Sequence, residues 1–86
     1  MSTNAEQTTT WLLDWFVARN AAVATTDGRL NTNYFDAKWI DSLGVVELIA
    51  DVEDHFKIRF TERDFQDRRF STISGLTEII GERHGG

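Results

Sequence analysis

The chain has 86 residues, of which 41% are hydrophobic and 27% are charged, a composition typical of one small globular domain. Nine lysines and arginines stand against fourteen aspartates and glutamates; the formal charge of −5 disfavours nucleic acid and favours basic protein partners. The chain has no cysteine, which excludes disulfides, a thiol nucleophile and a cysteine-bound metal, so any thiol must come from an attached group.

No apolar run in the sequence is long enough to cross a membrane, and the polar N-terminus lacks the regions of a signal peptide. We therefore expect a cytoplasmic protein without membrane insertion. The polar residues 1–7 are expected to form a disordered tail, residues 8–84 the folded domain, and residues 85–86 a second tail.

The first predicted helix follows three threonines whose hydroxyls can cap its N-terminus. Its apolar residues recur close to the helical period over about four turns. The threonines are Thr8, Thr9 and Thr10, and the apolar residues are Leu12, Trp15, Phe16 and Val23.

A long loop is predicted over residues 25–38, because Asp27-Gly28 is a turn signal and poor helix formers follow it. Loops of this length are usually functional or disordered, and aromatic side chains favour the ordered case here. We expect four side chains to anchor the loop to the core: Tyr34, Phe35, Trp39 and Ile40.

The second predicted helix spans residues 43–56, with Asp41 as its N-cap. A carboxylate at that position accepts hydrogen bonds from unpaired backbone N–H groups and interacts favourably with the helix dipole. The side predicted to face the core carries Leu43, Val46, Ile49, Val52 and Phe56.

Two shorter segments complete the predicted fold. Thr61 begins a capping box for a short third helix, with Phe65 turned inward. Ser71 or Thr72 caps a last helix, for which Gly81 is a candidate end. The connector before the third helix is expected to bury Phe56, Ile58 and Phe60, and the last helix Ile73, Leu76, Ile79 and Ile80. These patterns predict an all-α four-helix bundle with a long loop between the first two helices and a short third helix.

Ser42 stands at the predicted start of the second helix, where unpaired backbone N–H groups suit a phosphate. A hydrolytic serine would need a nearby base, and the histidines are His55 and His84. His55 lies thirteen residues along the same helix, about 20 Å away, and His84 lies near the chain end. The Gly-x-Ser-x-Gly pattern of hydrolases is also absent, so Ser42 is predicted to be a site of modification.

The run Asp41-Ser42-Leu43-Gly44-Val45-Val46-Glu47-Leu48 closely resembles the signature of acyl carrier proteins, and the resemblance extends over residues 11–80. It implies a bundle of the acyl-carrier type with 4'-phosphopantetheine, taken from coenzyme A, joined to Ser42 through a phosphodiester. It implies a discrete, non-catalytic carrier that shuttles a thioester-bound acyl or aminoacyl group between enzymes. The bulky Ile40 and the glycine Gly44 resemble the sequence pattern of D-alanyl and other aminoacyl carriers more closely than that of fatty-acid carriers.

The resemblance also implies a set of partners and a docking surface on the second helix. The partners are a phosphopantetheinyl transferase, an acyl- or aminoacyl-activating ligase, and a downstream transferase or synthase, acting on a monomeric carrier. The implied docking residues are Asp41, Leu43, Val46, Glu47 and Asp51. Acidic residues on this helix suit the basic side chains of such enzymes. Leu43 and Val46 thus have two interpretations, core residue or partner contact, and we expect Leu43 to be partly exposed.

Three alternatives belong to other functional classes. Asp27-Gly28-Arg29-Leu30 resembles the middle of a calcium-binding EF-hand loop, but Val23, Thr25 and Tyr34 occupy ligand positions. A helical DNA-binding domain would place the acidic second helix in a groove walled by phosphates. The like charges would repel each other, so we set this alternative aside. The serious alternative is a carrier-like adaptor that is never modified and acts only through protein binding.

Overall fold

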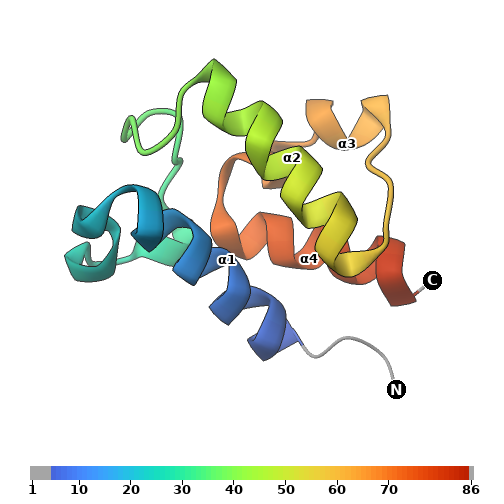
Figure 1. Ribbon diagram of the computed structural model, residues 1–86, viewed down its shortest axis with the longest axis horizontal. Coiled ribbons are helices and arrows are strands. Elements are labelled where there is room, and N and C mark those ends of the chain that lie inside the picture. The colour runs from blue at the N-terminus through green and yellow to red at the C-terminus, as the bar shows by residue number, and fades with distance from the viewer. Residues whose placement is uncertain (1–4, 86) are drawn as a thin grey trace.

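The computed structural model describes residues 5–85, with side chains described as far as Arg83. Within these residues the chain forms four α-helices and three short 3₁₀ helices and no strand, which confirms the predicted all-α bundle. The α-helices are α1 (Ala5–Arg19), α2 (Ser42–Phe56), α3 (Glu62–Gln66) and α4 (Ile73–Gly85). The 3₁₀ helices are η1 (Ala21–Thr25), η2 (Arg29–Asn31) and η3 (Arg68–Ser71). In the view of Figure 1, α4 lies between α1 and α2.

One hydrophobic core joins these elements, and α4 packs at its centre against α1, η2 and η3. The four residues predicted to face inward on α4 are all fully buried. The completely buried apolar side chains are Leu12, Phe16, Val23, Tyr34, Val52, Ile73, Leu76, Ile79 and Ile80. No helix in the described part of the chain is both long enough and apolar enough to span a bilayer.

The first helix begins at Ala5, earlier than the predicted threonine cap. Thr8 is buried, and the Thr10 hydroxyl donates to the carbonyl of Glu6 within the helix. Thr9 hydrogen-bonds through its hydroxyl to Thr77 of α4 at 3.0 Å. The predicted N-cap role of these threonines is therefore wrong: α1 begins before them, and the hydroxyls of Thr9 and Thr10 bond between and within helices. Residues 1–4 and 86 of the expected tails lie outside the described residues.

The long loop is ordered by the side chain of Tyr34. This side chain is fully buried, and its hydroxyl donates to the carbonyl of Phe70. Trp39 and Ile40 are also buried, as predicted, but Phe35 is 40% exposed. The Asn33 side chain accepts from the backbone N–H groups of residues 35 and 36, a tight turn that directs Phe35 outward. The predicted anchoring role of Phe35 is wrong.

The buried side of α2 is rotated relative to the prediction. Leu48, Val52 and Phe56 are buried, and they recur every four residues along one face of the helix. Leu43 and Val46 instead expose 70% and 60% of their surface. Their predicted core position is wrong, and the exposure expected for Leu43 is confirmed.

The short helix α3 has the predicted capping box. The Thr61 hydroxyl accepts from the backbone N–H of Asp64, and the Asp64 carboxylate accepts from that of Thr61. The inward residue differs from the prediction, because Phe65 is 45% exposed and Asp64 is 3% exposed. A carboxylate can be buried here because Arg83 of α4 pairs with it.

The last helix is capped by Thr72, whose hydroxyl accepts from the backbone N–H of Gly75 at 2.9 Å. The helix continues past Gly81 to Gly85, so the predicted end at Gly81 is wrong. A glycine ends a helix when it adopts a left-handed conformation, and among the described glycines only Gly28 has a positive φ.

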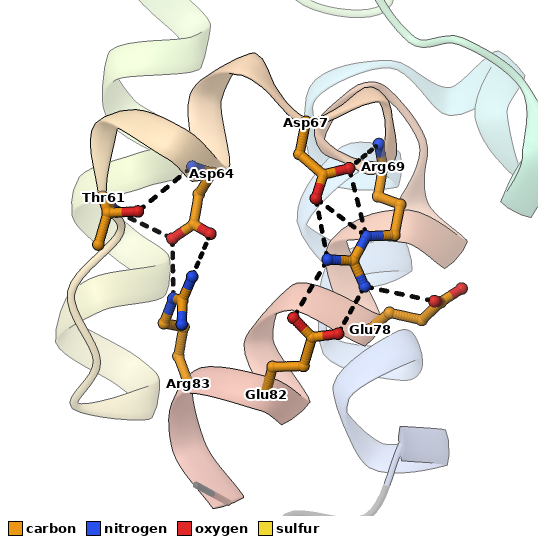
Figure 2. A network of polar contacts seen from close by, with 7 residues as sticks. All are labelled: Thr61, Asp64, Asp67, Arg69, Glu78, Glu82 and Arg83. Carbon is orange, nitrogen blue, oxygen red and sulfur yellow. Dashed lines mark hydrogen bonds and ion pairs between the residues drawn. The ribbon is translucent and has the colours of Figure 1, made fainter.

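Figure 2 shows the polar network that holds α3 and η3 against α4. Arg83 donates to both oxygens of Asp64, at 2.6 and 2.9 Å, which lowers the pKa of Asp64 to about 2. Arg69 bridges Asp67 at 2.9 Å and Glu82 at 2.7 Å. Hydrogen bonds from Arg69 hold the pKa of both carboxylates below its ordinary range. The network fixes the segment that faces the first half of α2.

Candidate functional site

Ser42 is the first residue of α2, and it is exposed to solvent. Asp41 is the N-cap, as predicted: its Oδ1 accepts from the backbone N–H of Gly44 at 2.7 Å. Its carbonyl accepts from the backbone N–H of Val45 at 2.9 Å. The cap thus fixes the backbone on both sides of Ser42 and leaves the hydroxyl at the surface.

The surroundings of Ser42 fit an attached phosphate. The hydroxyl of Ser42 forms no hydrogen bond with any residue that the structure describes. The backbone N–H groups of Ser42 and Leu43 belong to the first turn, where a helix has no acceptor of its own. These donors, together with the positive end of the α2 dipole, stabilise a negative charge placed on the hydroxyl.

Ile40 and Gly44, the two residues near Ser42 that differ from the fatty-acid carrier pattern, lie next to each other in the structure. A β-carbon on Gly44 would lie 2.8 Å from Cγ1 of Ile40 and 3.2 Å from Oδ1 of Asp41. The buried Ile40 side chain therefore occupies the space that a side chain at position 44 would need. A side chain at position 44 would therefore force Ile40 to shift from its observed position.

An apolar groove of about 320 Å³ lies between α2, the long loop and the α3–η3 segment. It is lined by Phe35, Val45, Ile49, Phe65, Asp67, Phe70 and Ser71. Ser42 shares one face of α2 with Val45 and Ile49, because residues three, four and seven positions apart are neighbours on a helix. The groove therefore begins about one turn away from the Ser42 hydroxyl.

The opposite side of α2 carries Glu47 and Asp51, two of the predicted acidic residues, and a cation of α1 lies close to both. Arg19 of α1 lies 3.9 Å from Glu47 and 3.9 Å from Asp51. Asp51 also accepts a 2.8 Å hydrogen bond from the indole N–H of Trp15. The Arg19 guanidinium stacks on the Trp15 ring, 3.7 Å from its centroid, which fixes its position.

A second, more polar cavity of about 460 Å³ opens on this acidic side of α2. Its lining includes the cations Arg19 and Lys38 and the anions Asp41 and Glu47. Lys38 has a φ of +61°, a left-handed conformation that is unfavourable for a residue with a side chain.

No histidine side chain among the described residues lies beside Ser42. His55 lies at the far end of α2, where its ring stacks on Trp11 with centroids 4.7 Å apart. The side chain of His84 lies outside the described residues. The described part of the chain also has no cluster of three or more side chains suited to a metal ion.

The sequence predicted that six residues lie along one helix or at its N-terminal end, and the structure shows all of them exposed there: Asp41, Ser42, Leu43, Val46, Glu47 and Asp51. The sequence-based prediction missed Arg19, Phe35 and Phe65, which border the same region. No local signal marked Arg19, because its partners lie about thirty positions further along the chain. The exposed phenylalanines are adjacent to buried side chains, and apolar character alone did not separate the two groups.

Comparisons with known proteins identify a family. The family model described as "Phosphopantetheine attachment site" matches residues 16–80, which include Ser42 and the whole of α2. No solved structure gives a significant match to the chain.

Three D-alanyl carrier proteins are similar to the chain. That of Streptococcus mutans is 37% identical over 54 residues, covering 58% of this chain and 68% of its own length. That of Streptococcus uberis is 38% identical over 48 residues, covering 56% and 61%. That of Streptococcus sanguinis is 34% identical over 53 residues, covering 62% and 67%. The matched region thus spans about two thirds or less of each relative.

Proposed function

The chain belongs to the phosphopantetheine attachment-site family, and on this premise we propose that Ser42 is the residue that bears the arm. The chain is a carrier protein with covalently attached 4'-phosphopantetheine that shuttles thioester-bound acyl or aminoacyl groups. The observation that carries the assignment to Ser42 is its exposed hydroxyl at the start of α2, free of hydrogen bonds to the described residues.

The residues around Ser42 have defined tasks in attachment. The Ser42 oxygen attacks the phosphorus that bears pantetheine in coenzyme A, and a new P–O bond forms. The P–O bond to the nucleotide half of coenzyme A breaks, that half leaves, and the hydroxyl proton passes to the transferase. The N–H groups of the first turn of α2 stabilise the phosphodiester that results. When attached, the arm supplies the thiol that this cysteine-free chain lacks.

We extend the proposal to an aminoacyl cargo, D-alanine or another small amino acid. The support is the similarity to three D-alanyl carrier proteins. The paired Ile40 and Gly44, which resemble the aminoacyl carriers in pattern, point the same way. Cargo is selected by the enzyme that loads the arm, so its identity is a property of the carrier together with that enzyme.

Carriers of this kind work with a phosphopantetheinyl transferase and with ligases. For this chain we propose an aminoacyl-activating ligase and a downstream transferase or synthase as the further partners of a monomeric carrier. Their docking face comprises Leu43 and Val46 beside Ser42, bordered by Asp41, Glu47 and Asp51. The chain itself catalyses no step in this proposal. Coenzyme A, the transferase and the carrier must share a compartment, which we place in the cytoplasm.

Incubation with coenzyme A and a broad-specificity phosphopantetheinyl transferase tests the proposal. The intact mass is expected to rise by one phosphopantetheine group, and the Ser42→Ala variant is expected to show no increase. Ser74 is the matched control, since it is a half-buried serine near the start of α4 whose replacement by alanine leaves Ser42 untouched. An unchanged mass for the natural chain would favour the unmodified adaptor, and a gain that survives Ser42→Ala would assign the arm elsewhere.

A further inference from the structure

The polar cavity beside the start of α2 has a volume of about 460 Å³ and is assembled from three parts of the chain. One wall is a stripe of α2, in which Asp41, Gly44 and Glu47 follow one another at intervals of three residues. The other walls come from Arg19 of α1 and from the end of the long loop, residues 38–40. Pockets that hold small organic molecules have volumes of about 300–1,000 Å³, so this cavity is large enough for such a group.

Trp39 brings an unpaired hydrogen-bond donor to this cavity. The residue is only 9% exposed, and its indole N–H forms no hydrogen bond with any residue that the structure describes. No buried polar side-chain atom in the described part of the chain lacks a partner, so this N–H must reach the solvent. A buried indole N–H usually has a partner, as that of Trp15 has in Asp51. The N–H of Trp39 is therefore available to a ligand.

Lys38 brings a cation to the same cavity. Its left-handed backbone is held by two hydrogen bonds within the loop: the N–H of Lys38 donates to the carbonyl of Phe35, and the N–H of Trp39 donates to that of Tyr34. Strained backbone conformations of this kind persist where the surrounding structure fixes them, and they are concentrated at ligand sites. The turn thus places a cation and a free donor, from adjacent residues, at one cavity.

The charge of Lys38 has no counterpart in the chain. Among the described residues, no carboxylate lies within ion-pair distance of Lys38. The two carboxylates of the lining have other neighbours: Oδ1 of Asp41 accepts from the N–H of Gly44 at 2.7 Å, and Arg19 lies 3.9 Å from Glu47. An anion that enters the cavity can therefore pair with Lys38 without displacing a contact of the fold.

The arm proposed at Ser42 carries groups that match this lining. Its phosphodiester is an anion, and a hydroxyl and an amide carbonyl follow within a few bonds; a lysine suits the first, and an N–H donor suits the last. Ser42 follows Asp41 directly, so the arm begins beside a residue of the cavity wall. The apolar groove suits the phosphate less well, because its charged lining residue is a carboxylate, Asp67. Attachment also keeps the arm at a high local concentration, so a few weak contacts are enough to hold it.

We propose that the first half of the phosphopantetheine arm lies in this polar cavity, with its phosphodiester beside Lys38 and its first amide carbonyl accepting from the indole N–H of Trp39. The inference rests on the proposed attachment at Ser42. It gives the arm a resting position on its own chain, from which the thiol end extends past the cavity.

The indole N–H signal of Trp39 in nuclear magnetic resonance spectra tests this position. Spectra of the ¹⁵N-labelled chain are recorded before and after loading with coenzyme A and the broad-specificity transferase, and the intact mass confirms the load. The Trp39 indole proton is expected to move downfield. Its exchange with water is expected to slow about fivefold to tenfold, which corresponds to an arm that covers it about 80–90% of the time.

The other two tryptophans are controls within the same spectrum. The indole of Trp15 already donates to Asp51, and Trp11 packs against His55 at the far end of α2, so neither signal is expected to change. The Trp39→Phe variant lacks one indole signal and thereby assigns that of Trp39. A chain with the arm on Ser42 and an unchanged Trp39 signal would overturn the proposal.

Two lysines with a left-handed backbone form a matched pair for the ionic contact. Lys38 and Lys57 have φ angles of +61° and +57°, and both residues are exposed. Lys38→Gln is expected to reduce the protection of the Trp39 indole against exchange about twofold to fivefold, the range of an exposed ion pair. Lys57→Gln makes the same change in net charge away from the cavity and is expected to have no effect. Equal effects of the two substitutions would overturn the role given to Lys38.

Nuclear Overhauser contacts of the two methyl groups of the arm locate it directly. We expect contacts with the Trp39 ring and with the Ile40 side chain. Contacts with Ile49 or Phe65 instead would place the arm in the apolar groove and would contradict the proposal. The absence of any mass gain in the natural chain would count against attachment at Ser42, and the resting position would be rejected with it.

Discussion

The indole N–H of Trp15 donates a 2.8 Å hydrogen bond to Oδ2 of Asp51, and this bond joins the buried side of α1 to the exposed side of α2. Trp15 is 8% exposed, whereas the Asp51 side chain is half exposed. A residue proposed for docking therefore also satisfies a buried donor of the core. Asp51 thus has a structural role, the hydrogen bond to Trp15, in addition to the docking role proposed for it.

Replacement of Asp51 is expected to reveal this double role. Asp51→Ala leaves the Trp15 indole N–H without its partner and is expected to lower the free energy of unfolding by about 1–2 kcal/mol. Asp51→Asn retains an acceptor and is expected to cost less than half of that. Urea denaturation followed by tryptophan fluorescence measures both variants. Equal stability of Asp51→Ala and the natural chain would show that the hydrogen bond contributes nothing.

The ion pair between Asp64 and Arg83 predicts a loss of stability in acid. The pKa of Asp64 is about 2 in the folded chain, lowered chiefly by hydrogen bonds from Arg83, against about 4 in an unfolded chain. Because this pKa is lower in the folded chain than in the unfolded chain, the carboxylate stabilises the fold at every pH above the unfolded-state pKa. That contribution, about 2 kcal/mol, is lost as the pH falls from about 4 to about 2. Chemical denaturation at a series of pH values between 7 and 2 measures it.

The control for this pH dependence is Asp64→Asn, which removes the titrating group at the same position. It is expected to lower stability at neutral pH and to flatten the decline between about pH 4 and pH 2. The same acid sensitivity in Asp64→Asn as in the natural chain would assign the decline to other carboxylates.

Gly75 and Gly81 of α4 form a matched pair of helical glycines. A β-carbon on Gly75 would overlap the carbonyl oxygen of Arg69 in η3, whereas one on Gly81 would have no neighbour within 4 Å. Gly75→Ala is expected to destabilise the chain by about 3 kcal/mol because of overpacking. Gly81→Ala is expected to stabilise it by about 0.5–1 kcal/mol, since alanine is the better helix former. Thermal unfolding compares the two; a tolerated alanine at position 75 would contradict the close approach of η3.

The left-handed backbone at Lys38 predicts a stabilising substitution. Lys38→Gly removes a steric cost of about 1–2 kcal/mol. Glycine also raises the conformational entropy of the unfolded chain, which lowers stability by about 0.4–1 kcal/mol. The net effect expected is therefore a stabilisation of about 0.5 kcal/mol. Lys38→Ala removes the charge but keeps the β-carbon, and it is expected to leave stability unchanged. Urea midpoints that move equally for both variants would show that the charge, not the backbone, is responsible.

Helix caps and apolar spacing predicted the fold because both are local. Asp41, Thr61 and Thr72 each cap the helix that was expected to follow them. Local patterns did not determine which of two adjacent apolar residues faces inward. Phe65 was expected in the core, but the charge pair of Asp64 with Arg83, formed across nineteen residues, turns Asp64 inward instead.

The candidate site likewise contains residues that local sequence predicted and residues that it did not predict. Ser42 was predicted from a contiguous motif, and Asp41 from its position before a helix. Arg19 comes close to Glu47 only because α1 lies beside α2. The groove that Phe35 and Phe65 line forms only where the long loop, α2 and the α3–η3 segment meet. Such arrangements follow from tertiary packing, and the chain order of the residues carries no sign of them.

The identity of the modified residue is tested most directly on protein isolated from the cells that produce it. Trypsin cleaves after Lys38 and Lys57, and in the peptide of residues 39–57 the only side chain with a hydroxyl is that of Ser42. Peptide mass spectrometry is expected to find phosphopantetheine on this peptide and on no other. An unmodified 39–57 peptide, or an arm located elsewhere in the chain, would contradict the assignment of Ser42.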